Sequence, residues 1–365
     1  MTGANAVSAT PAPVRADWPI VTVIVPVRNE GRHLGETLRC LLEGDYPVDR
    51  MEVLVVDGCS TDATADVAAE IAATDRRVRL LRNTRLTAPA GLNVGLAAAA
   101  GDVVVRLDGH ARPAPDYVRR CVDALDRTGA TAVGGMLVGR GSTSFGRAVA
   151  AAGATPLGAG DARYRLGGEG PVDTIYLGAW HRADLERLGG FDEALPRNQD
   201  YELCERIRAS GGTVWLDPRI KSDTVVRSDP ASLATQYFGY GAGRAATVAK
   251  HRRSLRARQA VPAGVVGLAA LLGAAAPWSA TARRALGALA AAYTAAVAAA
   301  SLVAAGGRSG RNLRGRDAGW LPVAYGVMHG AWGAGFWSGL ARTGVKSLAA
   351  VRRRSGDPTD RGRDL

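Results

Sequence analysis

The chain has 365 residues, of which 47% are hydrophobic, and a formal net charge of +12. This length accommodates one large α/β domain and an appendage. Basic residues gather after residue 240, where they flank uncharged stretches, whereas the first 240 residues are slightly acidic. This distribution favours an anionic membrane surface over nucleic acid, because no aromatic residues are interleaved with the basic ones to stack on bases.

The cysteines and the N-terminal segment indicate an intracellular protein. The four cysteines are far apart and form no CxxC pair, which argues against a disulfide framework and a zinc site and fits a reducing compartment. Residues 1–17 are rich in Ala, Thr and Pro and lack the apolar core of a signal peptide. We expect a disordered lead-in there.

Residues 18–229 alternate short apolar strands with helical stretches, which predicts an α/β domain with a mainly parallel sheet. We predict strands over residues 21–25, 53–56, 78–81, 103–107, 132–138, 174–177 and 213–216. The first strand should end at Pro26, and Asn29 should cap a helix over residues 30–42. Further helices are predicted after Thr61 or Asp62, from Pro89 to Ala100, from Pro115, and over residues 182–188 and 201–210. The Gly-rich segment 139–170 is expected to be a loop with at most one short helix.

The last third of the chain has the pattern of a membrane region. Residues 230–260 mix aromatic and basic side chains, which is typical of an amphipathic interfacial segment. Residues 261–278 and 285–305 carry no charge and approach the length that crosses a bilayer; a buried helical hairpin is the alternative. In the third uncharged stretch, 318–341, Pro322, several Gly and His329 favour a re-entrant or interfacial course over a span. Residues 342–365 form a basic tail.

The segment from Val103 to His110 carries the strongest chemical signal. A β-branched run predicts a buried parallel strand, and Asp108-Gly109-His110 follows its carboxyl end, where open α/β sheets bind ligands. Asp108 and His110 can offer an oxygen and a nitrogen to one divalent cation, which suits a substrate with a diphosphate. A solvated Asp-Gly turn is the alternative.

Two further carboxylates lie at element ends. Asp57 follows the second predicted strand, where a carboxylate can accept the imide N–H of uracil; an Asx turn is the alternative, and Asp62 is expected to be only a helix cap. Asp200 begins a predicted helix whose dipole would keep it ionised, so it is a candidate general base or an N-cap. Trp180 and His181 could shape an acceptor pocket or belong to the core.

Several segments occur together in a family-specific order: residues 21–30, Asp57-Gly58-Cys59-Ser60-Thr61-Asp62, Asn93-x-Gly95 with Gly101-Asp102, the Asp108 motif, and Gly189-Gly190-Phe191-Asp192 leading to Asp200. With these segments the first 220 residues closely resemble the GT-A, family 2 glycosyltransferases. The resemblance implies inverting transfer of a sugar from a nucleotide diphospho-sugar, with a divalent cation, Mg²⁺ or Mn²⁺. By it, Asp108 and His110 stand in the metal motif, Asp200 is the base, and the donor is bound by Pro26, Arg28, Glu30, Asp57 and Asp108.

Two positions depart from the family pattern. The usual Asp-x-Asp motif is Asp108-Gly109-His110, and the usual Glu-Asp pair is Gln199-Asp200. The chain is similar in these two forms to the succinoglycan-type exopolysaccharide subgroup, and so are the segment from Gln236 to Arg244 and the segment around His329. The acceptor in that subgroup is typically a polyprenyl-linked sugar. Gln199 and Gln236 therefore join Trp180 and His181 as candidate acceptor residues. Arg244 could close on the donor pyrophosphate as a mobile lid or contact a lipid phosphate.

These observations predict a glycosyltransferase that adds one sugar from a UDP-sugar to a lipid-linked glycan, because the Gln-x-x-Arg-Trp motif of processive synthases is absent. It would act at the inner (plasma) membrane with a cytoplasmic catalytic domain. Its expected partners are the donor, the polyprenyl-linked acceptor, membrane lipid and other polysaccharide-assembly proteins, but not nucleic acid. The alternatives are a polyprenyl-phosphate sugar synthase and a non-catalytic membrane scaffold. A nicotinamide-dependent oxidoreductase is disfavoured, because no Gly-rich turn follows the first strand.

Overall fold

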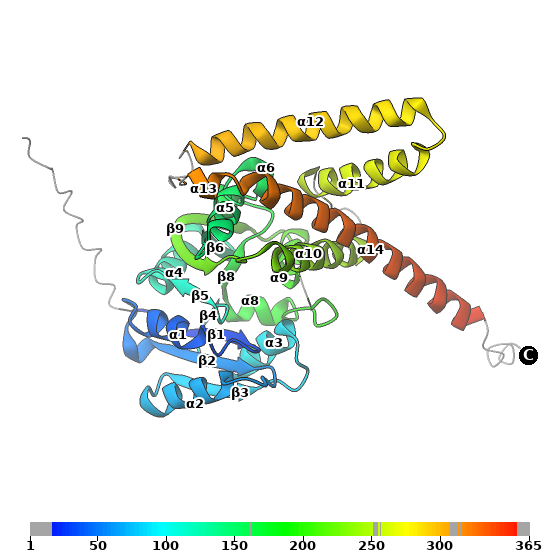
Figure 1. Ribbon diagram of the computed structural model, residues 1–365. Coiled ribbons are helices and arrows are strands. Elements are labelled where there is room, and N and C mark those ends of the chain that lie inside the picture. The colour runs from blue at the N-terminus through cyan, green and yellow to red at the C-terminus, as the bar shows by residue number, and fades with distance from the viewer. Residues whose placement is uncertain are drawn as a thin grey trace, which may run out of the picture.

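The computed structural model combines an α/β domain with a helical region (Figure 1). It describes residues 17–160, 162–196, 198–250, 255, 257–306, 313 and 315–355, and side chains as far as residue 342 except those of residues 257 and 258. The lead-in predicted over 1–17, apart from Asp17, residues 251–254 and 256 of the predicted interfacial segment, and residues 356–365 of the basic tail lie outside the described part.

A mixed nine-stranded sheet forms the centre of the α/β domain, in the order β3-β2-β1-β4-β8-β6-β9-β5, with β7 also paired to β9. Strands β3, β2, β1 and β4 are parallel, and β8 is antiparallel to β4 and β6. The carboxyl ends of the four parallel strands therefore meet at one edge. The strands are β1 Val21–Val27, β2 Met51–Asp57, β3 Val78–Arg82, β4 Val103–Arg106, β5 Ala111–Pro113, β6 Ala132–Arg140, β7 Gly170–Pro171, β8 Tyr176–His181 and β9 Val214–Val225.

Helices cover both faces of this sheet, which explains why its central strands are apolar on both sides. Val23 and Val25 of β1 pack with α1 and α4 on one face, and Ile24 packs with α3 and α9 on the other. The mainly parallel α/β domain that the sequence predicts is thus confirmed. Its helices are α1 Leu34–Leu42, α2 Thr64–Thr74, α3 Ala88–Ala98, α4 Tyr117–Thr128, α8 Arg182–Arg187 and α9 Gln199–Ala209, with a 3-10 turn at Val48–Arg50.

Three local predictions are wrong. Strand β1 runs through Pro26, because Pro26 lies past the last residue pair that joins β1 to β4, where a missing N–H costs no bond to β4. Asn29 does not cap α1; it has a φ of 57° and accepts a hydrogen bond from the N–H of Thr61 at 2.9 Å. The Gly-rich segment holds three helices, α5 Ser144–Ala152, α6 Pro156–Ala159 and α7 Arg163–Leu166, of which the first two are capped by Thr143 and Thr155.

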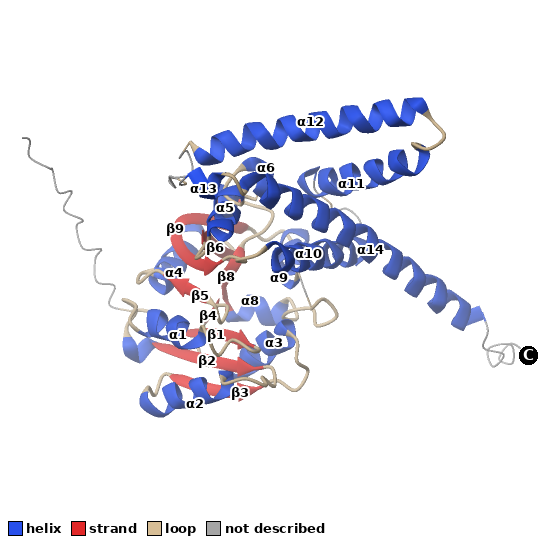
Figure 2. Cartoon of the chain, viewed as in Figure 1, coloured by secondary structure: helices blue, strands red, loops and turns tan. Residues whose placement is uncertain are grey.

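The helical region consists of α10 Pro230–Lys250, α11 Ala257–Ala275, α12 Ala280–Ala305, α13 Gly315–Ala318 and α14 Leu321–Ser355 (Figure 2). Among the described residues, α12 alone is long and apolar enough to cross a membrane, and the apolar part of α11 is shorter. Pro322 does not interrupt α14, because it occupies the first turn of that helix, where its missing N–H has no partner in any helix.

Polar side chains fasten the helical region to the α/β domain. Arg147 of α5 forms an ion pair with the buried Asp317 of α13 at 2.8 Å. The hydroxyls of Thr155 and Tyr325 are 2.8 Å apart. The Nδ1 of His329 lies 2.9 Å from the hydroxyl of Tyr293, and its Nε2 lies 2.9 Å from the carbonyl of Leu157. His329 also lines the cavity described next.

Candidate active site

A cavity of about 1750 Å³ lies between the carboxyl edge of the parallel strands and the helical region. One part is lined by charged side chains of the α/β domain, including Asp108, His110 and Asp200. Another part is lined by apolar side chains of α11, α12 and α14. Asp108 and His110 therefore line the same cavity as Asp200, which comes from a distant part of the chain.

Asp108, just past the end of β4, is held by the guanidinium group of Arg106. The Nε of Arg106 donates a hydrogen bond to Oδ1 of Asp108 at 3.0 Å, and Nη2 lies at 2.9 Å from the same oxygen. Arg106 is buried, and although burial opposes its charged form, Asp108 and Asp200 raise the pKa of its guanidinium. Arg106 was not among the site residues expected from the sequence. A charged residue inside the apolar run before Asp108 was the signal available.

His110 is paired with Glu30 across the cavity edge. Its Nδ1 lies 2.9 Å from Oε1 of Glu30, a residue in the loop after β1. Burial opposes protonation of the imidazole, but the hydrogen bond to Glu30 and the charge of Asp108 together raise the pKa of His110. Glu30 thus lies in the predicted donor region and also orients the imidazole.

The chemistry of these side chains fits a divalent cation. A metal-bound imidazole commonly donates its second ring N–H to a carboxylate, as Nδ1 of His110 can to Glu30, which leaves Nε2 to bind the ion. Asp108 would add a carboxylate oxygen. Among the residues that the structure describes, no group of three or more His, Cys, Asp and Glu side chains surrounds a single point. A cation bound here would therefore need oxygen ligands from substrate or water.

Asp200 is the second residue of α9. The residue just before that helix, Asn198, has a φ of 61°. Its Oδ1 accepts a hydrogen bond from the N–H of Tyr201 at 2.8 Å. Burial raises the pKa of the Asp200 carboxyl above its ordinary value, and the nearby charge of Arg106 opposes that rise. Burial is the largest influence on this pKa, ahead of the hydrogen bonds from backbone N–H groups at the start of the helix, and the role of Asp200 as general base stays a prediction.

The predicted donor residues separate into two groups. Arg28 and Glu30 line the cavity. Asp57 is 7% exposed and is outside the cavity lining; its carboxylate accepts hydrogen bonds from the N–H and the hydroxyl of Ser60. Pro26 is likewise not part of the lining. The structure therefore brings the loop after β1 to the cavity and gives Asp57 the Asx-turn contacts that were its alternative interpretation.

The candidate acceptor residues also separate. Gln199 and Gln236 line the cavity, but His181 does not. Trp180 is 1% exposed and packs edge-on against Phe191 in the core, so its core interpretation is the one that the packing supports.

Arg244 does not have the form of a mobile lid. It lines the cavity but is 2% exposed, and its guanidinium carbon lies 3.6 Å from the centre of the Tyr201 ring. The stacking fastens α10 to α9, next to Asp200.

Known proteins match both the sequence and the fold. Residues 22–177 match the model of Glycosyl transferase family 2. The chain is 32% identical over 323 residues to the succinoglycan biosynthesis protein ExoA of Rhizobium meliloti (strain 1021), covering 87% of this chain and 94% of that protein. The chain belongs to glycosyltransferase family 2. The resemblance stated from the sequence motifs, and the GT-A fold that it implies, are confirmed.

Two further relatives of this family 2 glycosyltransferase carry informative names. The dolichyl N-acetyl-alpha-D-glucosaminyl phosphate 3-beta-D-2,3-diacetamido-2,3-dideoxy-beta-D-glucuronosyltransferase of Methanococcus voltae is 23% identical, covering 63% of this chain and 74% of that protein. The mannosyltransferase PcManGT of Pyrobaculum calidifontis, solved with GDP-Man and Mn²⁺, is 26% identical with a TM-score of 0.56, covering 89% of this chain and 88% of that one.

Proposed function

We propose that this glycosyltransferase moves one sugar from a nucleotide diphospho-sugar to a glycan carried on a polyprenyl lipid, in exopolysaccharide or cell-surface polysaccharide synthesis. The cavity carries this proposal, because it joins Asp108, His110 and Asp200 to an apolar lining from α11, α12 and α14. An acceptor with a long hydrocarbon chain fits both parts. The names of the succinoglycan biosynthesis and dolichyl-linked relatives support the same acceptor class.

In the proposed mechanism Asp200 is the general base. Its buried position and raised pKa make the carboxylate a better proton acceptor than an exposed Asp. It removes the proton from the acceptor hydroxyl as that oxygen attacks the anomeric carbon from the face opposite the departing diphosphate. This single displacement inverts the anomeric centre, and no enzyme nucleophile is needed.

Asp108 and His110 would hold the divalent cation, Mg²⁺ or Mn²⁺, which neutralises charge on the departing diphosphate when bound. Arg106 fixes the orientation of Asp108, and Glu30 fixes that of His110. The Mn²⁺ in the PcManGT complex supports this assignment. For the donor we keep the UDP-sugar that the sequence predicts, with a GDP-sugar, as in that same complex, as the competitor.

We further propose that α11 and α12 anchor the enzyme in the plasma membrane with the catalytic domain in the cytoplasm, where nucleotide sugars are made. Exposed apolar side chains on these helices, such as Leu271 and Leu302, support this placement. A polyprenyl-phosphate sugar synthase uses the same cavity and is the second candidate. A non-catalytic scaffold is disfavoured, because Asp108, His110 and Asp200 converge on one space.

The test is a panel of nucleotide sugars supplied to membranes that contain the enzyme, with lipid-extracted products identified by mass spectrometry. We expect one sugar to be added to a polyprenyl-linked glycan, and Asp200→Asn to lower the turnover by about 10²-fold or more while the protein still binds the donor. Transfer to polyprenyl phosphate itself would support the synthase instead. Near-normal transfer by Asp200→Asn would remove Asp200 as the base.

A further inference from the structure

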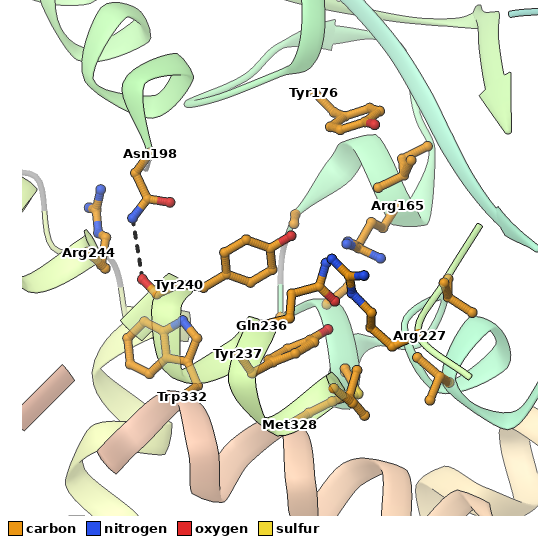
Figure 3. A pocket seen from close by; sticks show the side chains of 18 of the residues that line it. Arg165, Tyr176, Asn198, Arg227, Gln236, Tyr237, Tyr240, Arg244, Met328 and Trp332 are labelled. Carbon is orange, nitrogen blue, oxygen red and sulfur yellow. Dashed lines mark hydrogen bonds between the residues drawn. The ribbon is translucent and has the colours of Figure 1, made fainter. Parts of the chain in front are cut away.

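Two arginines line the cavity away from the Asp108–Arg106 pair. Arg165 comes from α7, and Arg227 follows the end of β9. Among the residues that the structure describes, neither forms an ion pair with a carboxylate, whereas Arg106 and Arg147 do. Figure 3 shows both side chains and Gln236 directed into the same part of the cavity.

Neutral hydrogen-bonding groups lie beside the two arginines, and the carboxylate of Asp229, whose charge interacts with Arg227, accepts hydrogen bonds from the N–H and the hydroxyl of Ser232 in the first turn of α10. Gln236, Tyr237 and Tyr240 of α10 line the cavity beside them (Figure 3). Burial raises the pKa of Tyr237 to about 12, so its hydroxyl stays protonated at physiological pH and can donate. Two cations with neutral donors in a partly enclosed space form a site for an anion.

The position of these arginines identifies the kind of anion. Arg165 and Arg227 line the same cavity as Asp108, His110 and Asp200, so an anion bound to the arginines shares one space with the residues proposed to be catalytic. The apolar part of the same cavity is lined by Val261 and Val265 of α11, Leu289 and Ala292 of α12, and Met328 of α14. A ligand that spans both parts has an anionic group joined to a hydrocarbon chain.

Building on the proposed function, we propose that Arg165 and Arg227 bind the phosphate groups of the lipid-linked acceptor, a polyprenyl diphosphate. Guanidinium groups bind phosphate oxygens in a bidentate geometry, which suits an ester with several such oxygens. The polyprenyl chain then lies along α11, α12 and α14, and the glycan extends toward Asp200. Asp108 and His110 would hold the cation that neutralises the donor diphosphate, so the two diphosphates of the substrates would be bound by different residues of the cavity.

The test uses the purified full-length chain in lipid nanodiscs and measures binding of a radiolabelled long-chain polyprenyl diphosphate. We expect Arg165→Gln and Arg227→Gln each to weaken this binding by about 10-fold or more. Binding of the matching polyprenol, which has no phosphate, should be weak and the same in all proteins. The dissociation constants of UDP and GDP should be unchanged. Arg163→Gln is the matched control, because Arg163 also belongs to α7 but contacts the carbonyls of Glu169 and Pro171.

Three outcomes would overturn the inference: unchanged binding of polyprenyl diphosphate in both variants, a parallel loss of nucleotide affinity, or inorganic diphosphate binding as tightly as the lipid. The second outcome would assign the arginines to the donor, and the third would make the site one for a free anion. Arg165→Lys and Arg227→Lys, which keep the charge, should retain more lipid affinity than the Gln variants. Lipid binding that depends on the arginines, in an enzyme that transfers no sugar to any glycan linked to polyprenyl diphosphate, would refute the proposed function and leave this site standing.

Discussion

Arg106 connects the two carboxylates of the candidate active site. It bonds Asp108 directly, and it is close enough to Asp200 to lower the pKa of that carboxyl. Burial has the opposite and larger effect on Asp200. The proton affinity of the proposed base is therefore set by a balance between a buried position and one neighbouring cation, and the activity should respond to pH accordingly.

Replacing Arg106 should move the acid limb of the pH profile. A general base works only when it is deprotonated, so kcat should fall as the pH drops through the raised pKa of Asp200. Removing the cation in Arg106→Gln raises that pKa further, which shifts the limb to higher pH; Arg106→Lys, which keeps the charge, should shift it less. The measurement is kcat against pH at saturating donor, acceptor and Mn²⁺. An unmoved limb in Arg106→Gln would contradict the assignment of Asp200.

The pair of Glu30 and His110 predicts a specific effect on metal affinity. Glu30→Gln removes the carboxylate that orients the imidazole, so we expect half-maximal activity to need about 10-fold more Mn²⁺. Glu36→Gln is the control, because Glu36 lies on α1 outside the cavity lining and pairs with Arg112. Activity should vanish in excess EDTA, and Mn²⁺ should be preferred to Mg²⁺ because a nitrogen ligand is present. Full activity in EDTA would exclude the metal.

At the scale of elements, α10 couples the helical region to the helix that carries Asp200. Asn198, just before α9, donates a hydrogen bond to the carbonyl of Tyr240 in α10 at 3.4 Å, and Arg244 of α10 stacks on Tyr201 of α9. On its other side α10 packs against α14 with almost no space between the backbones. A Cβ placed on Gly335 would lie 2.1 Å from the carbonyl oxygen of Phe238.

Gly335→Ala should therefore destabilise the protein, because the added methyl group forces α10 and α14 apart. We expect a loss of about 1–3 kcal/mol in the free energy of unfolding. Gly330→Ala is the matched control on the same helix, since nothing lies within 4 Å of its Cβ position; alanine there should be neutral or stabilising by up to about 1 kcal/mol. Thermal unfolding in detergent, followed by circular dichroism, compares the two. Equal stability would mean that the helices do not pack so closely.

At the scale of the whole molecule, the cavity lies between two parts, and neither part contains all of it. The α/β domain supplies the charged end, and α10, α11, α12 and α14 supply the rest of the lining. The Arg147–Asp317 ion pair and the Thr155–Tyr325 hydrogen bond are among the contacts that hold the two parts together. The shape of the cavity thus depends on how the helical region packs against the α/β domain.

Cysteine labelling tests the proposed orientation. The turn between α11 and α12 exposes 86% of Trp278, and in the proposed topology it lies on the side of the membrane opposite the catalytic domain. In an active variant without the four native cysteines, Trp278→Cys should react with an impermeant maleimide in intact cells. Glu43→Cys, an exposed site on the α/β domain, should react only after permeabilisation. The reverse pattern would invert the topology, and two protected sites would place the turn on the cytoplasmic side.

The sequence by itself determined the parallel strands, the positions of Asp108 and His110 just after one of them, and the position of Asp200 at the start of a helix. β-branched runs and helix starts are local signals, and residues at the carboxyl ends of parallel strands meet wherever such strands pair. It also predicted helices at α11 and α12, since an uncharged stretch of that length has few other stable forms.

Only the tertiary structure decided which side chains reach the cavity. Trp180 packs in the core, and Arg244 stacks on the ring of Tyr201. Arg106, Arg165 and Arg227, in contrast, line the cavity. These outcomes depend on partners far away in the chain. The short helices α5 to α7 likewise form against neighbours rather than from their own periodicity. Burial and pairing are properties of the packed molecule, and no local pattern of residues specifies them.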